Sequence, residues 1–264
     1  MNIIVCIKQV PATDEVKINK ETNTIIREGV SAIINPFDSY AIEEGLRIKD
    51  KIGGNVTVMS MGIPAVADLL KETISFGVDD TVLLSDRAFA GADSLATAYA
   101  LSMGIKKIGQ YDLIICGKQA IDGDTAQVGP SLAEKLGIPH TTYVKKIEEI
   151  REGYIRCQRM TDDGYEVIEM SLPAVITVVK EINEPRLPSI KNKIRAKNAT
   201  VNVLTADDIG ADKELCGLKG SPTQVVKTFV PTHNVNSEMI EGQPNEQANK
   251  LADRLMNLNI KISN

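Results

Sequence analysis

The chain has 264 residues, of which 43% are hydrophobic and 25% are charged, and its formal net charge is −5. This is the composition of a globular protein with enough apolar residues for a real core. The negative charge and an aromatic content of 4%, with no Trp, argue against a nucleic-acid platform, which needs a basic surface and stacking rings. No apolar run reaches the roughly 20 residues of a membrane helix, and the N-terminus lacks the pattern of a cleaved leader. We therefore expect a cytoplasmic protein without a membrane span.

Cysteine and histidine give little support for side-chain catalysis or metal binding. The four cysteines stand singly, with no CxxC pair, at positions 6, 116, 157 and 216. We expect reduced, mostly buried thiols. His140 and His233 are far apart and lack the spacing of metal ligands. What remains is a binding or redox role in which a cofactor supplies the chemistry.

Strands and helices alternate through the first half of the chain. Ile3–Ile7 is a continuous apolar run, typical of a strand that is buried on both faces of a parallel sheet. Similar strands are expected at Val56–Met59, Thr81–Leu84 and Leu113–Cys116. Helices are expected from Asp38 or Ser39 to Gly53, from Pro64 to Gly77, from Ser94 to Ile108, and over Ser131–Leu136. The alternation predicts an α/β fold with a doubly wound, mostly parallel sheet, helices on both faces and ligands at the carboxyl ends of the strands.

The pattern changes after Pro139. Two tight-turn sequences, at 151–153 and 162–164, separate three expected antiparallel strands. These strands are Thr141–Ile150, Tyr154–Thr161 and Glu166–Leu172, and a further apolar strand follows at Ala174–Lys180, so the extension covers about 141–180.

The last part of the chain, after Gly210, is polar and broken by prolines. Such a segment cannot form its own core, so we expect an α/β domain over 1–209 and a C-terminal arm over 210–264 that packs on a partner subunit. The arm ends in a helical pattern that places Leu251, Leu255 and Leu258 on one stripe.

The most informative segment is the polar, glycine-punctuated loop Gly117–Pro130. It leaves a buried strand and enters a helix, where backbone N–H groups and the helix dipole can hold a nucleotide phosphate. It matches neither GxxxxGK[ST] nor GxGxxG. The alternative is an ordinary, if long, strand-to-helix connection. The candidate contacts in this loop are Gly117, Lys118, Gln119, Ala120, Ile121, Asp122, Gly123, Asp124, Thr125, Ala126, Gln127 and Val128.

Two other helix starts carry candidate binding residues. In Asn35-Pro36-Phe37-Asp38, the Asn35 amide can hydrogen-bond an adenine edge or a ribose, and the alternative is a plain helix cap by Asp38. Further along, Ser94 and Thr97 lie in the first turn of a helix and can present hydroxyls to a ring or phosphate, the alternative being a capping role for the preceding aspartate.

Several segments together resemble the β subunit of electron transfer flavoproteins. They are Val5–Val10, Asn35–Asp38, Gly117–Asp122, Arg159–Glu166, Leu172–Thr177, Asn183–Arg186 and Ala196–Lys197. The resemblance implies an adenine-nucleotide-binding α/β domain paired with an α subunit in an obligate heterodimer. It implies nucleotide contacts at Cys6, at residues 35–38, at Met61 and in the loop 117–128, with Cys6 as a packing or backbone contact. It also makes Ile190, in a docking loop over 183–197, the anchor for an acyl-CoA dehydrogenase.

Within this family, the loop Asp122–Val128 resembles the electron-bifurcating branch, which predicts a second FAD in place of AMP. Gly123 lets a pyrophosphate approach the backbone, and the side chains of Ala126 and Val128 leave room for the FMN half. Ser94 and Thr97 then lie where they can bond the isoalloxazine ring. In this interpretation NADH reduces the flavin, and its electrons divide between the α-subunit FAD and a low-potential acceptor such as ferredoxin or flavodoxin.

Three alternatives stay open from the sequence. The first is a non-bifurcating β subunit that holds AMP as a structural nucleotide. The second is an adenylate-forming or ATP-pyrophosphatase-like enzyme, although Lys8-Gln9-Val10-Pro11 stands where that class has a Ser-Gly-Gly-x-Asp-Ser loop. The third is a stress-type ATP-binding module, in which the long C-terminal arm would have no purpose.

Overall fold

The computed structural model describes residues 1–12, 18–19, 24–25, 32–226 and 237–258. The chain forms two units, Met1–Val226 and Lys227–Asn264. Among the described residues, no helix is both long enough and apolar enough to cross a membrane.

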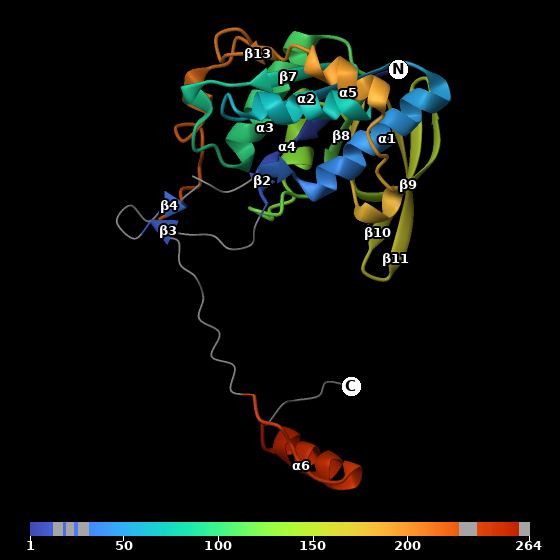
Figure 1. Cartoon of the computed structure of the whole chain (residues 1–264), viewed down its shortest axis with the longest axis vertical. Coiled ribbons are helices and arrows are strands. Elements are labelled where there is room, and N and C mark those ends of the chain that lie inside the picture. The colour runs from blue at the N-terminus through green and yellow to red at the C-terminus, as the bar shows by residue number, and fades with distance from the viewer. Residues whose placement is uncertain (13–17, 20–23, 26–31, 227–236, 259–264) are drawn as a thin grey trace. The chain divides into compact units, whose positions relative to one another are not determined.

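A nine-stranded sheet forms the centre of the first unit, in the order β11-β10-β9-β12-β8-β1-β6-β7-β13 (Figure 1). All neighbours from β9 to β13 pair in parallel, and β9, β10 and β11 form an antiparallel meander. The strands are β1 (Asn2–Ile7), β6 (Asn55–Met61), β7 (Asp80–Leu84), β8 (Leu113–Gly117), β9 (His140–Arg151), β10 (Tyr154–Thr161), β11 (Gly164–Ser171), β12 (Ala174–Val178) and β13 (Asn202–Leu204). The predicted α/β fold with an antiparallel extension is confirmed.

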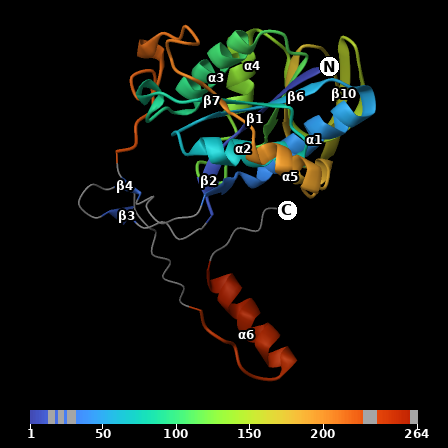
Figure 2. The ribbon, with the colours of Figure 1, turned by 45° about the horizontal axis from the view of Figure 1, so that its top comes forward.

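Helices cover both faces of the parallel part of the sheet (Figure 2). One face carries α1 (Pro36–Ile52), α2 (Val66–Phe76) and α5 (Ile190–Lys197), and the other carries α3 (Ser94–Ile108) and α4 (Val128–Leu136). Successive side chains of β1 supply the two cores alternately: Ile3 and Val5 pack with α1 and α2, whereas Ile4 and Cys6 pack with α3 and α4. Burial on both faces explains the continuous apolar runs of these strands.

The strand order reverses direction next to β1. The chain passes from β1 to β6 and β7 on one side and then returns to β8 on the other side of β1. As a result, the connection after β1 leads to α1 on one face, whereas the loop after β8 leads to α4 on the opposite face. The carboxyl ends of β1 and β8 are therefore a topological switch point, where open α/β sheets bind their ligands.

Some elements differ from the sequence-based expectation. Helix α4 begins at Val128 rather than at Ser131, and the strand expected to reach Lys180 ends at Val178, before the 3₁₀ turn η2 (Lys180–Ile182). The connection between β1 and α1 contains short strands that leave no periodic signal: β2 (Gln9–Pro11) pairs with β5 (Ala32–Ile34), and β3 (Ile18–Asn19) pairs with β4 (Thr24–Ile25).

The expected docking loop over 183–197 contains a helix, which is a correction to the sequence interpretation. Helix α5 begins at Ile190, and the Ser189 hydroxyl accepts the N–H of Asn192 at 3.1 Å as its N-cap. Ser189 is a residue type that often begins a helix, but the prolines at 185 and 188 favoured the interpretation of this segment as a loop.

The first unit extends to Val226, beyond the expected domain boundary at residue 209. Residues 210–226 contribute Cys216, which is 1% exposed, to the core beneath α3. Hydrogen bonds hold this polar stretch: the N–H of Leu218 donates to the carbonyl of Ala90 at 2.9 Å, and the N–H of Asp93 donates to the Ser221 hydroxyl at 2.8 Å.

The second unit contains the helix α6 (Pro244–Asn257), which the leucine spacing predicted. A capping box of Gln243 and Glu246 begins it. Within this unit, Leu251 and Leu255 remain 49% and 48% exposed, so the unit does not bury its own apolar stripe.

Candidate functional site

The end of β1, the end of β8 and the start of α1 meet at the side chain of Asp38. This carboxyl group is 5% exposed, and its Oδ2 accepts the backbone N–H of Lys8 at 2.7 Å. The backbone of Gly117 lies directly against it, since a Cβ atom there would be 2.3 Å from Oδ1. Asp38 thus ties three elements together, and it does not act as the helix cap that was the alternative for this residue.

The Asn35 amide fixes the loop after β8. Its Nδ2 donates to the carbonyl of Gln119 at 2.8 Å, and its Oδ1 accepts the N–H of Ile121 at 3.1 Å. The residue is 1% exposed. Both polar atoms are engaged within the chain, so Asn35 shapes the loop, and a direct contact with an adenine or ribose stays a prediction.

An ion pair closes the loop against β1. The Lys8 ammonium is 2.6 Å from Oδ1 of Asp122, and the Gln119 amide bonds the carboxylate of Asp124. We call Lys8, Asn35, Asp38 and the loop 117–128 the switch-point site. It brings together most of the residues that the sequence singled out.

The backbone of the loop uses left-handed conformations at Asp124 and Ala126, with φ of 56° and 53°. Gly123, by contrast, is not in that region, and a Cβ atom there would meet nothing within 4 Å. Neither the turn nor the packing of this chain therefore requires a glycine at 123. The open space beside its backbone is available to a ligand.

The two helices on this face begin differently. Helix α4 follows Gln127 with no side-chain cap and no acidic residue in its first turn, so its N-terminal N–H groups can bind an anion. Helix α3, in contrast, is capped by Asp93, which accepts the N–H groups of Leu95 and Ala96, each at 3.0 Å. Ser94 and Thr97, the predicted binding residues, lie in that first turn, where the Asp93 carboxylate already occupies the place of an anion. Their role as flavin contacts stays a prediction.

Two buried thiols lie under the site. Cys6 and Cys116 are register partners on neighbouring strands and are 7% and 6% exposed. Hydrogen bonding to Cys6 and burial raise the pKa of the Cys116 thiol well above its usual value, so it is protonated and unreactive at neutral pH.

Burial likewise raises the pKa of Asp38 to about 7, although the N–H groups of Lys8 and Gly117 and the Asn35 amide partly oppose the shift.

Sequence reasoning missed two residues near this edge. Tyr143 in β9 has a φ of 58°, unusual for a bulky residue, and its N–H donates to the Thr177 hydroxyl at 3.2 Å. The Lys118 ammonium lies 5.1 Å from the Tyr143 ring and 5.8 Å from the Phe37 ring. The second missed residue is Ser60, near the end of β6 beside Met61, whose buried hydroxyl has no hydrogen-bond partner among the described residues. Neither residue has a signal in a single sequence.

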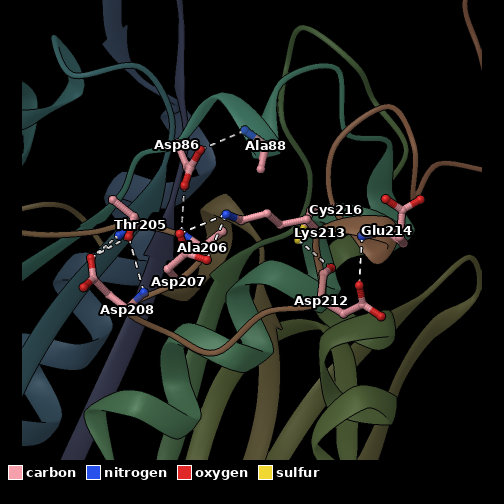
Figure 3. A network of polar contacts seen from close by, with 10 residues as sticks. All are labelled: Asp86, Ala88, Thr205, Ala206, Asp207, Asp208, Asp212, Lys213, Glu214 and Cys216. Carbon is pink, nitrogen blue, oxygen red and sulfur yellow. Dashed lines mark hydrogen bonds and ion pairs between the residues drawn. The ribbon is translucent and has the colours of Figure 1, made fainter.

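A polar network covers the carboxyl end of β7 (Figure 3). Asp86 accepts the N–H of Ala88 and the N–H of Ala206, each at 3.0 Å. It thereby attaches the segment after β13 to the end of β7, and Lys213 pairs with Asp207 at 2.8 Å beyond it. These hydrogen bonds lower the pKa of Asp86. The network's carboxylates are engaged in capping and pairing, so we assign it a structural role.

Other features lie outside the switch-point site. A cavity of about 1040 Å³ opens at the opposite edge of the sheet, where its lining includes Asn2, Thr57 and Thr81 at the amino-terminal side of the strands. Ile190 lies at the start of α5 and is 81% exposed. Among the described residues, no group of three or more His, Cys, Asp or Glu side chains could hold a metal ion.

Comparisons with known proteins show the family to which the chain belongs. Residues 22–209 match the electron transfer flavoprotein domain family. The chain is 52% identical over 256 residues to the electron transfer flavoprotein subunit beta of Thermoanaerobacterium thermosaccharolyticum, covering 97% of this chain and 98% of that one. It is 48% identical to the caffeyl-CoA reductase-Etf complex subunit CarD of Acetobacterium woodii, with 97% and 98% covered. It is also 45% identical to the protein FixA of Azotobacter vinelandii, with 94% and 91% covered. The chain therefore belongs to the electron transfer flavoprotein family, among its β subunits.

Proposed function

We propose that this chain is the β subunit of a heterodimeric, electron-bifurcating electron transfer flavoprotein and that it holds a second FAD at the switch-point site. The observation that carries the proposal is the pairing of the uncapped N-terminus of α4 with the open backbone at Gly123. The first can hold a pyrophosphate, and the second leaves the backbone of the same loop open to a ligand.

The residues of the switch-point site fit a bound FAD. The site supplies N–H donors without an opposing carboxylate at α4, and the loop that presents them is held by Asn35 and by the ion pair of Lys8 with Asp122. The unpartnered Ser60 hydroxyl is a further polar atom near the same edge of the sheet. In this role the chain binds and orients the cofactor, because the cofactor itself carries the redox chemistry.

A bound flavin would supply the exchange of electrons between NADH, the FAD of the α subunit and a low-potential acceptor such as ferredoxin or flavodoxin. The similarity to a subunit of a caffeyl-CoA reductase-Etf complex supports an enzyme that acts on a CoA ester as a further partner, and we propose an acyl-CoA dehydrogenase in that role.

The competing proposal is a β subunit that holds AMP as a structural nucleotide. AMP needs the same anion site at α4 but no space for a second nucleotide half. The open space at the Gly123 backbone leaves room for the larger ligand, which is why we propose FAD rather than AMP.

Cofactor extraction from the purified heterodimer tests the proposal directly. Two FAD per heterodimer support it, whereas one FAD and one AMP overturn it in favour of the AMP-holding subunit. The Gly123→Val variant provides a matched test, because a branched side chain at an open position should reduce the FAD content while leaving the fold intact.

The segment 183–197 supports a docking role toward the dehydrogenase. Its first part is fixed to α1, because Nε of Arg186 lies 2.7 Å from the Glu43 carboxylate and the Asn183 amide donates to Glu44 at 2.9 Å. From this base, Leu187 and Ile190 project at 89% and 81% exposure. Lys191 and Lys193 follow in the same helix. An exposed apolar residue on an anchored segment is suited to insert into a pocket of a partner.

A further inference from the structure

The Asp38 carboxyl group is a buried ionisable group at the junction of β1, β8 and α1. Its Oδ2 holds the N–H of Lys8 at 2.7 Å, and the backbone of Gly117 packs on its other oxygen. A change in its charge therefore acts on both strand ends from which the switch-point site is built.

The groups that face Asp38 come from each adjoining element. Just after β1 comes Lys8, whose backbone N–H bonds the carboxyl group and whose ammonium is paired with Asp122 at 2.6 Å. From β8 comes the Cys116 thiol, which is protonated. Asp38 itself lies in the first turn of α1, where the helix dipole favours a negative charge.

Burial outweighs these favourable contacts and brings the pKa of Asp38 to about 7. At neutral pH the group is thus divided between its neutral and charged forms. An anion bound at the adjoining loop would repel the charged form, because little water screens two negative charges at a buried position.

We propose that Asp38 is a proton-linked positioning residue: the proton on its carboxyl group and the phosphates of a nucleotide at the loop 117–128 bind cooperatively. The inference rests on the proposed function, since it needs a nucleotide at this site. By linkage, phosphate binding draws a proton onto Asp38, and a proton on Asp38 tightens phosphate binding.

FAD is a suitable probe, because the phosphate monoester of AMP itself titrates at about pH 6, whereas a pyrophosphate diester has no such proton. FAD is titrated into the complex of the full chain with its partner subunit, after removal of the β-subunit nucleotide, at pH 6, 7 and 8. Proton uptake is measured in the same samples by calorimetry in two buffers of different ionisation enthalpy. We expect the dissociation constant to rise by about three- to tenfold between pH 6 and 8 and a fraction of one proton to be taken up at pH 7.

The Asp38→Asn variant should bind FAD with a dissociation constant that does not vary over this range. Its matched control is Asp68→Asn on α2, where the carboxylate is 89% exposed. In this control the dissociation constant should vary with pH as it does in the wild type. If Asp38→Asn fails to fold, proton uptake by the wild-type complex still tests the inference. Binding of FAD without proton uptake overturns it.

The outcomes separate the two proposals. If FAD binds and its dissociation constant depends on pH equally in wild type and Asp38→Asn, the inference is overturned, whereas the proposed function still holds. Binding of AMP but not FAD, with proton uptake that exceeds that of the AMP phosphate and disappears in Asp38→Asn, supports the inference and overturns the second FAD. Absence of any nucleotide binding overturns both.

Discussion

Gly117 and Asp38 approach so closely that a Cβ atom at 117 would lie 2.3 Å from Oδ1 of the carboxyl group. The same atom would lie 2.7 Å from the carbonyl carbon of Phe37, which is backbone and cannot rotate away. The end of β8 can therefore reach the start of α1 only through a glycine.

Gly117→Ala should lower the free energy of unfolding by about 2 kcal/mol or more, because either the helix start or the strand end must move. Gly123→Ala, in the same loop, should leave stability within about 0.5 kcal/mol, since its Cβ meets nothing within 4 Å. Chemical denaturation of the two variants measures both values. Equal losses of stability would contradict the assigned packing.

The stability of the fold should depend on pH through Asp38. Its pKa is about 7 in the folded chain against an ordinary value of 3.8, so between these limits the folded state binds the proton that the unfolded state has released. This contribution is present in full below pH 3.8 and is lost as the pH rises toward 7, at about 1.4 kcal/mol per pH unit for one proton. Asp38→Asn should remove this part of the slope, as urea denaturation from pH 5 to 8 would reveal. An unchanged slope would mean that another group titrates.

The loop 117–128 should loosen when Asn35 is replaced by the isosteric Leu. The substitution leaves the carbonyl of Gln119 and the N–H of Ile121 without their partner, at a cost of about 1 to 3 kcal/mol. Hydrogen exchange in the loop should accelerate, and nucleotide should dissociate faster. Asn55→Ala is the control, because its amide bonds Asp80 at the opposite edge of the sheet. Unaltered exchange in the Asn35 variant would refute the role of its amide.

The exposed stripe of α6 should be needed for the heterodimer. Leu251→Glu combined with Leu255→Glu places charges on the stripe, whereas Asn249→Glu adds a charge on the opposite side of the helix. We expect the double variant, like deletion of 244–264, to elute as separate subunits in size-exclusion chromatography and the control to elute as the complex. A heterodimer that survives both changes would show that α6 packs elsewhere.

Ile190→Ala should weaken electron transfer to the dehydrogenase at least several-fold and leave the bound nucleotide unchanged, because the side chain lies outside the switch-point site. Ile52→Ala is the matched control, an isoleucine 42% exposed at the end of α1. Kinetics with limiting dehydrogenase measure the effect. Loss of nucleotide from the Ile190 variant would contradict the docking role of this residue.

The sheet was predictable because its strands are buried on both faces. Ile3–Ile7 and Leu113–Cys116 read as strands from local composition alone, and helix α3 was predicted with its observed bounds because Asp93 and Gly109 mark its ends. Strand β13 was missed, since its three residues pair with β7 only after the chain has folded back. The burial of Cys216 was missed for the same reason, as single apolar residues in a polar segment carry no period.

The sequence singled out residues that the fold brings together, but it did not show the contacts between them. Sequence reasoning selected Asn35, Asp38 and the loop as separate binding elements. It could not show that the Asn35 amide holds the loop, since Asn35 and Gln119 are 84 residues apart. Nor could it show that Asp38 faces the backbones of Lys8 and Gly117, because these contacts form only when the chain has folded. The capping role of Asp93 at α3, given as the alternative for that helix start, is confirmed, whereas the sequence did not show that α4 begins without a side-chain cap.

The two outer strands of the nine-stranded sheet bear on aggregation. An open sheet presents unpaired N–H and C=O groups at each edge, and these can recruit strands from other molecules. At one edge β13 is only three residues long. At the other edge, β11 places the charged side chains of Glu166 and Glu169 beside the exposed Tyr165 and Val167. A short strand at one edge and charged side chains at the other, where Glu166 and Glu169 pair with Arg159 and Arg156, discourage edge-to-edge pairing of sheets. Substitution of both glutamates by threonine should therefore increase aggregation.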